Sequence, residues 1–229
     1  MKQAVLILLT VFSALAQAQE IKQVPMINVS GEGKIKVAPD EALISISVET
    51  KGTDATTVKK ENDSKMDAIL KFIKKENIAK EDYQTQRVAL NPNYDYEKKK
   101  HNYIAVQTVQ ILLRDLSKYD ALMDGLVNTG INRIDNVVFQ SSKIKQLQSD
   151  ARKLAVKDAK AKAEDFVTVL GQKVGKAISI SDNSTNYNPP PIMYASMKTM
   201  EMDGAAPRET LATGEIEIIV NVSVGFILE

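Results

Sequence analysis

The segment that decides the fold is 215–228, which reads EIEIIVNVSVGFIL. Its apolar side chains recur at every second position, and they belong to Ile216, Ile218, Val220, Val222, Val224, Phe226 and Leu228. A strict period of two indicates a β-strand with one buried face. A strand this long and regular invites pairing along its edges, so we expect it to lie in the centre of a sheet or to pair with a neighbouring subunit.

Two more alternating segments lie near the start of the chain, at 26–37 and 42–49. The short connection between them contains Pro39, whose ring presets a backbone angle that turns require. Two alternating segments joined by such a turn predict a β-hairpin.

Gly31 and Gly33 fall on the apolar face of the first of these strands. Phosphate-binding glycine loops lie between a strand and the N-terminus of a helix, whereas these glycines lie inside a strand. We therefore interpret them as a bulge or as a place where another backbone approaches closely.

Helical spacing of apolar residues predicts helices at 55–75, 117–128 and 144–170. The longest of them has alanine at every fourth position from Ala151 to Ala163, which lets a helix pack unusually close to its neighbour. We expect its buried stripe to consist of Leu147, Ala151, Leu154, Ala155, Ala159, Ala163, Phe166 and Leu170.

Further strands are predicted at 81–90, 103–114, 131–140 and 174–181. The connection at 91–102 is polar and rich in lysine, so we expect it to lie in solvent. This order of elements predicts an α+β fold: mixed, largely antiparallel sheets built from ββα-type units, with helices on one face and a long C-terminal strand. We expect one domain at 19–229, either undivided or made of two interleaved subdomains, with an irregular loop at 182–213.

The first eighteen residues have the pattern of a secretory signal. Lys2 is followed by an uncharged apolar run at 4–15 and by the small-x-small sequence Ala16-Gln17-Ala18. This pattern predicts cleavage after Ala18 and a periplasmic location for the mature protein. The apolar run is shorter than the roughly 20 residues that span a bilayer, so we expect no transmembrane anchor after cleavage.

The composition excludes several kinds of function. The chain has 30 basic and 29 acidic residues, and nucleic-acid partners normally require a strong basic excess. It has no cysteine and one histidine, which leaves no thiol chemistry and no ordinary zinc site. We expect no cofactor.

Four stretches of the chain resemble the SIMPL-domain family, the periplasmic immunogenic or oxidative-stress-defence proteins of Gram-negative bacteria. They are VSGEG at 29–33 with VAPD at 37–40 and VET at 48–50; EDYQT at 81–85 with LNPNYDY at 90–96 and YIA at 103–105; LVNTGINRI at 126–134; and AR at 151–152 with AKA at 161–163 and LG at 170–171. The resemblance implies a periplasmic α+β protein that assembles into large homo-oligomers, proposed in some members to be ring-like or channel-like. It also implies a link to oxidative and envelope stress, and it transfers no catalytic residue.

The groups that most often carry catalysis are placed unfavourably. His101 lies in the charged run KKKHN at 98–102, where nothing suggests the orienting carboxylate that a catalytic triad needs. We interpret it as a solvated residue, and we interpret Asp40 and Glu41 as solvated residues of the turn that follows Pro39.

One cluster has chemical potential: Met193, Met197, Met200 and Met202. Thioethers select Cu(I), and methionine is also reversibly oxidised, so the cluster is a candidate copper site or oxidant sink. Methionine equally suits adaptable apolar contacts between subunits, which is the interpretation we favour because the loop has no supporting histidine.

The sequence thus predicts a non-enzymatic, oligomeric periplasmic protein associated with envelope and oxidative-stress tolerance, whose partner is a further copy of itself. The alternative is a periplasmic ligand-binding or copper-binding protein that uses the methionine-rich loop at 193–202. A hydrolase that uses carboxylates alone is a third possibility, which requires paired acids in a concave site.

Overall fold

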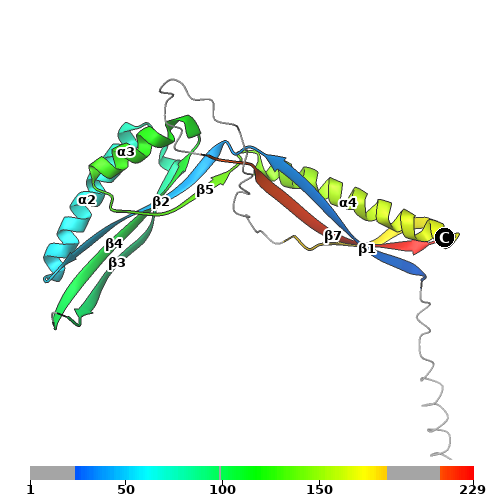
Figure 1. The fold of residues 1–229 in the computed structure, drawn as a ribbon, viewed down its shortest axis with the longest axis horizontal. Helices are drawn as coiled ribbons and strands as arrows, with labels where there is room; N and C mark the ends of the chain where they lie inside the picture. Colours follow the sequence, from blue (N-terminus) through cyan, green and yellow to red (C-terminus); the bar gives the residue numbers. More distant parts are fainter. Residues whose placement is uncertain (1–23, 98, 185–211) are drawn as a thin grey trace, which may run out of the picture.

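The computed structural model describes residues 24–97, 99–184 and 212–229, and in these ranges the chain forms two antiparallel sheets with helices packed on them (Figure 1). The α+β class and the long C-terminal strand are confirmed. The predicted signal at 1–18 and most of the loop at 182–213 lie outside the described residues.

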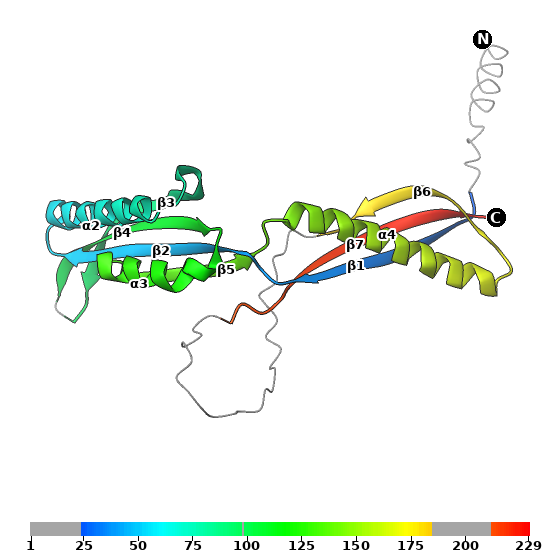
Figure 2. The same cartoon turned by 90° about the horizontal axis from the view of Figure 1, so that it is seen from above.

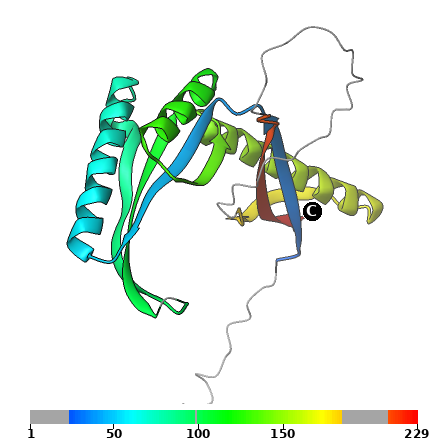
Figure 3. The same cartoon turned by 60° about the vertical axis from the view of Figure 1, so that its left-hand side comes forward.

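The first sheet, called here the β2 sheet, has the strand order β3-β4-β2-β5. Its elements are β2 (Glu41–Gly52), α2 (Ala55–Lys75), β3 (Tyr83–Asp95), β4 (Lys100–Leu113), α3 (Tyr119–Thr129) and β5 (Arg133–Gln140), with short 3₁₀ turns at Lys80–Asp82 and Leu116–Lys118. Helices α2 and α3 cover one face of this sheet (Figure 3). Their side chains Met66, Ile69 and Leu126 share a core cluster with Ile44 and Ile46 of β2. Gly130 ends α3 with a φ of 119°, the left-handed conformation that glycine adopts readily at a helix C-terminus.

The second sheet, called here the β7 sheet, has the order β1-β7-β6. Its elements are β1 (Met26–Val37), α4 (Ile144–Val169), β6 (Val174–Asp182) and β7 (Ile216–Leu228). The long terminal strand is central in this sheet, as its uninterrupted alternation predicts. It pairs with β1 from Met26 opposite Ile227 to Val37 opposite Ile216.

The predicted hairpin between the first two strands is wrong. β1 pairs with β7, whereas β2 pairs with β4 and β5, so the turn at Pro39 carries the chain from one sheet to the other (Figure 2). Alternation reveals a strand but not its partner. β1 directs glycines towards α4, whereas β2 directs isoleucines towards α2. Each strand therefore pairs in the sheet that its own helix covers.

The polar connection predicted at 91–102 is mostly strand. β3 continues to Asp95 and β4 begins at Lys100, with Tyr94 paired opposite His101. Its residues are largely exposed, as expected, but they extend the hairpin beyond the covered part of the sheet instead of forming an irregular loop.

Helix α4 lies with its backbone directly on the backbone of β1. A Cβ atom added to Gly31 would come within 2.0 Å of the carbonyl oxygen of Ala155, and one added to Gly33 within 1.9 Å of that of Ala151. Ala151, Ala155, Ala159 and Ala163 are fully buried in this contact. The close approach predicted from the glycines and from the alanine spacing is therefore confirmed.

The predicted stripe of α4 is too wide. Leu154, Phe166 and Leu170 are exposed, and Val167 occupies the buried position that was assigned to Phe166. The reason is geometric. Where α4 packs on the glycine backbone of β1, there is room only for one narrow row of small side chains at every fourth position. Larger residues beside that row point away from the strand.

Substitution of Gly33 by alanine should test this contact. Because the new methyl group would overlap a backbone oxygen that cannot swing away, we expect the free energy of unfolding to fall by about 3 kcal/mol or more, at the upper end of overpacking costs. Urea denaturation measures the change.

Gly175→Ala is the matched control, since Gly175 also lies in a strand but its Cβ would meet only the flexible side chain of Glu229. Equal effects of the two substitutions would contradict the tight contact.

Candidate functional site

The methionines singled out from the sequence, Met193, Met197, Met200 and Met202, lie outside the described residues. Copper binding by this cluster therefore stays a prediction. Within the described ranges, no group of three or more His, Asp or Glu side chains is placed to hold a metal ion.

His101 lies near the tip of the β3–β4 hairpin. Its ring packs against Tyr94 at 4.9 Å between ring centroids, and Tyr94 in turn meets Tyr96 edge to face at 5.0 Å. The side chain of His101 is exposed. This arrangement gives the histidine an aromatic neighbour in place of the orienting carboxylate that a triad needs.

Asp40 does not lie in a hairpin turn but joins the two places where the chain passes between the sheets. Its carboxylate accepts hydrogen bonds from the backbone N–H of Ser142 at 2.7 Å and from the Ser142 hydroxyl at 2.6 Å, and its own N–H donates to the carbonyl of Gln140. These bonds favour the charged form, so the hydroxyl and N–H of Ser142 lower the pKa of the Asp40 carboxyl.

Glu41 was expected to be solvated, but it is buried with 5% of its surface exposed. Arg114 donates to it at 3.2 Å and holds Asp82 with two further bonds of 2.6 and 2.8 Å. Two buried carboxylates thus share one guanidinium, which makes Glu41 part of a fixed ion network. Sequence reasoning missed Arg114 and Asp82, because their positions at a strand end and in a short turn resemble ordinary solvated charges.

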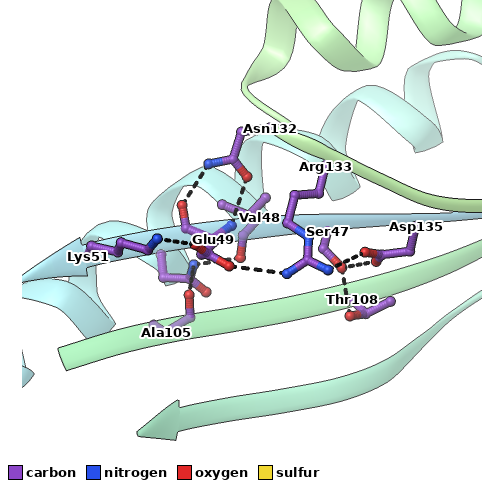
Figure 4. Close-up of polar contacts among 10 residues, drawn as sticks. Ser47, Val48, Glu49, Lys51, Ala105, Thr108, Asn132, Arg133 and Asp135 are labelled. Carbon is purple, nitrogen blue, oxygen red and sulfur yellow. Dashed lines mark hydrogen bonds and ion pairs between the residues drawn. The ribbon is translucent and has the colours of Figure 1, made fainter. Parts of the chain in front are cut away.

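A polar network involves the side chains of β2 that alternate with its core residues Ile44, Ile46 and Val48 (Figure 4). The hydroxyl of Ser47 lies 2.7 Å from that of Thr108 and also donates to Asp135. Arg133 bridges Asp135 at 3.0 Å and Glu49 at 3.1 Å. Lys51 completes the network at 2.9 Å from Glu49, and its bond is the largest cause of the lowered pKa of the Glu49 carboxyl, followed by that of Arg133.

A bulge in β5 makes this network possible. Ser45 pairs with Asn136 and Ile46 with Ile134, which leaves Asp135 as the extra residue with its carboxylate directed at Ser47. Just before the strand begins, the side chain of Asn132 accepts from the N–H of Glu49 at 2.8 Å and donates to its carbonyl at 2.7 Å. The side-chain amide of Asn132 thus pairs with the backbone of β2 at the position just before β5 begins.

The network resembles a nucleophile arrangement without being equipped as one. Ser47 is bonded to a carboxylate, but it is 1% exposed and has no imidazole to accept its proton. Its bonds satisfy a buried hydroxyl and tie three strands together. In the sequence, Ser45, Ser47 and Glu49 alternate with the apolar residues of this strand, but their partners in β5 depend on the bulge.

Comparison with known proteins identifies the family of this chain. The model of the SIMPL family, described as a protein of unknown function (DUF541), matches residues 27–226, which run from β1 to β7 and include both sheets. The chain belongs to the SIMPL family.

Three relatives illustrate the likeness to SIMPL proteins. The chain is 32% identical over 219 residues to the uncharacterized protein YggE of Escherichia coli (strain K12), covering 93% of this chain and 87% of that protein. It is 28% identical to the YggE protein of Edwardsiella ictaluri, covering 92% of each. It is 29% identical over 235 residues to the 26 kDa periplasmic immunogenic protein of Brucella melitensis, covering 98% and 93%.

None of the helices in the described part of this SIMPL chain is long and apolar enough to cross a membrane.

The bond between Asp40 and Ser142 predicts a pH dependence of stability. A carboxyl whose pKa is lowered by folding stabilises the native state above its unfolded value, near 3.8, and this contribution is lost as the pH falls through the lower folded pKa. Asp40→Asn should therefore reduce the urea midpoint at pH 7, and the deficit should shrink as the pH falls below about 4.

Asp67→Asn is the control, because Asp67 forms an exposed i,i+4 pair with Lys71 on α2 and its loss should matter little at neutral pH. A deficit of Asp40→Asn that is unchanged at pH 3 would show that the charge of Asp40 plays no part.

Proposed function

We propose that this protein is exported to the periplasm and works there without catalysis, as a homo-oligomer associated with tolerance of envelope and oxidative stress. The observation that carries the proposal is a set of large apolar side chains left exposed on two consecutive elements, α4 and β6. They are Leu154, Phe166, Val169, Leu170, Ile178 and Ile180.

The exposure of these side chains is high for their size. Phe166 is 60% exposed, Val169 87% and Leu170 70%, all within the last turns of α4 and its C-terminal cap. Scattered apolar residues are normal on a protein surface, but a group of them on adjoining elements is typical of an interaction site.

Strand β6, which carries Ile178 and Ile180, offers a second means of association. β6 stands at one edge of the β7 sheet, and Ile180 on it is 63% exposed. Edge strands present unpaired backbone groups, which a further strand can satisfy. The opposite edge is treated differently: Asp158 of α4 accepts from the N–H of Glu32, and Lys162 donates to the carbonyl of Ser30. Because α4 shields the β1 edge, the β6 edge is the one that favours pairing with a further strand.

The remaining parts of the proposal rest on other observations. The buried hydroxyl of Ser47 and the exposed position of His101 favour a role without catalysis. The signal-like residues 1–18, together with the relative in Brucella that is named a periplasmic protein, support the location. The association with stress rests on the resemblance to the family.

Multi-angle light scattering of the protein purified after export should give a mass well above that of one chain at micromolar concentration. Phe166→Lys should shift this mass towards the monomer, because a charge placed in an apolar contact must be desolvated. Lysine is a good helix former, so the helix itself should persist.

Val127→Lys is the matched control, an equally apolar and 54% exposed position on α3, and it should leave the mass unchanged. A strictly monomeric wild-type protein would refute the oligomer, and an unchanged mass for Phe166→Lys would refute this surface as the contact.

A further inference from the structure

A cleft of about 610 Å³ lies at one end of the β2 sheet, where the end of α2, the end of β4 and the start of α3 meet. Ile78, Ala121, Leu113 and Leu122 contribute to its wall, and the last two also belong to the hydrophobic core. Clefts that take small molecules have volumes of roughly 300–1,000 Å³ and mainly apolar walls with a few polar groups. The cleft therefore has the size and the apolar depth of a small-molecule site.

The polar end of the cleft contains an ion pair. Arg114 and Asp82 both line it, and two parallel hydrogen bonds of 2.8 and 2.6 Å join them. The third bond of Arg114 is to Glu41, which is buried and does not line the cleft. Three of the five N–H donors of Arg114 are thus bonded to carboxylates, which offset its positive charge.

The net charge of the side chains around the cleft favours a cationic ligand. Two carboxylates, Asp82 and Glu41, face the single positive charge of Arg114, which leaves an excess of negative charge at this end. Along the rest of the wall, Glu76, Glu81 and Asp115 outnumber Lys118.

We propose that this cleft binds a small amphipathic amine, with its apolar body against Leu113 and Leu122 and its ammonium group among the wall carboxylates. The site lies on α2, β4 and α3, apart from the α4 and β6 residues assigned to self-association, so the two proposals are independent.

Isothermal titration with 4-phenylbutylamine tests the proposal, with 4-phenylbutanol and 4-phenylbutyrate as neutral and anionic probes of the same shape. The amine should bind roughly tenfold more tightly than the alcohol, since a charge-assisted contact contributes that much, and the acid should bind most weakly. No binding of the amine at millimolar concentration, or equal binding of all three probes, would overturn the proposal.

Two variants locate the site. Ala121→Trp should abolish binding, because Ala121 lines the cleft and is itself exposed, so the larger ring fills the cleft without disturbing the core. Glu81→Gln should weaken amine binding by roughly two- to fivefold, whereas Glu61→Gln, an exposed acid of α2 away from the cleft, should not. Unchanged binding in Ala121→Trp would place the amine elsewhere and overturn the assignment.

Discussion

The rest of the β7 sheet depends on the contact between the backbone of α4 and the backbone of β1. Glycine at 31 and 33 removes every side-chain atom from the strand at the crossing, and alanine at every fourth position does the same for all but one carbon on the helix. At this separation α4 can reach the outer edge of β1 with Asp158 and Lys162. The strand is then held on one side by β7, along its whole length, and on the other by the helix. The two distant ends of the described chain are joined in this way, with no cysteine required.

Most of this contact can be predicted from the sequence, because it depends on the spacing of residues that are close together in the chain. Alternation identified β1 and β7, the four-residue alanine row identified the face of α4, and the two glycines inside a strand indicated a close backbone. Pairing between strands was harder to predict, since alternation says nothing about the partner, and the hairpin proposed across Pro39 was wrong for that reason. The assignment of Phe166 and Leu170 to the core failed because the width of the buried stripe depends on the surface that receives it.

For the polar groups too, local spacing predicts the position in a strand but not the partner that lies far away in the sequence. Ser47 and Glu49 alternate with apolar residues in the sequence, but their partners Arg133 and Asp135 are more than eighty positions away and are brought into place by a bulge. Arg114, Asp82 and Glu41 come from three separate segments, and nothing in their immediate neighbours marks them as one network. One network joins three strands on a sheet face, and the other places Arg114 and Asp82 at the polar end of a cleft, so their likeness in composition does not imply a likeness in role.

Native-state hydrogen exchange tests whether the β7 sheet depends on α4, because it measures the opening free energy of each backbone amide. If α4 and the β1–β7 pair form one structural unit, the amides of residues 151–163 and those of residues 218–226 should exchange with the same opening free energy. Gly33→Ala should lower both by the same amount. An opening free energy for α4 several kcal/mol below that of β7 would show that the helix opens independently, and would contradict the dependence of the sheet on this contact.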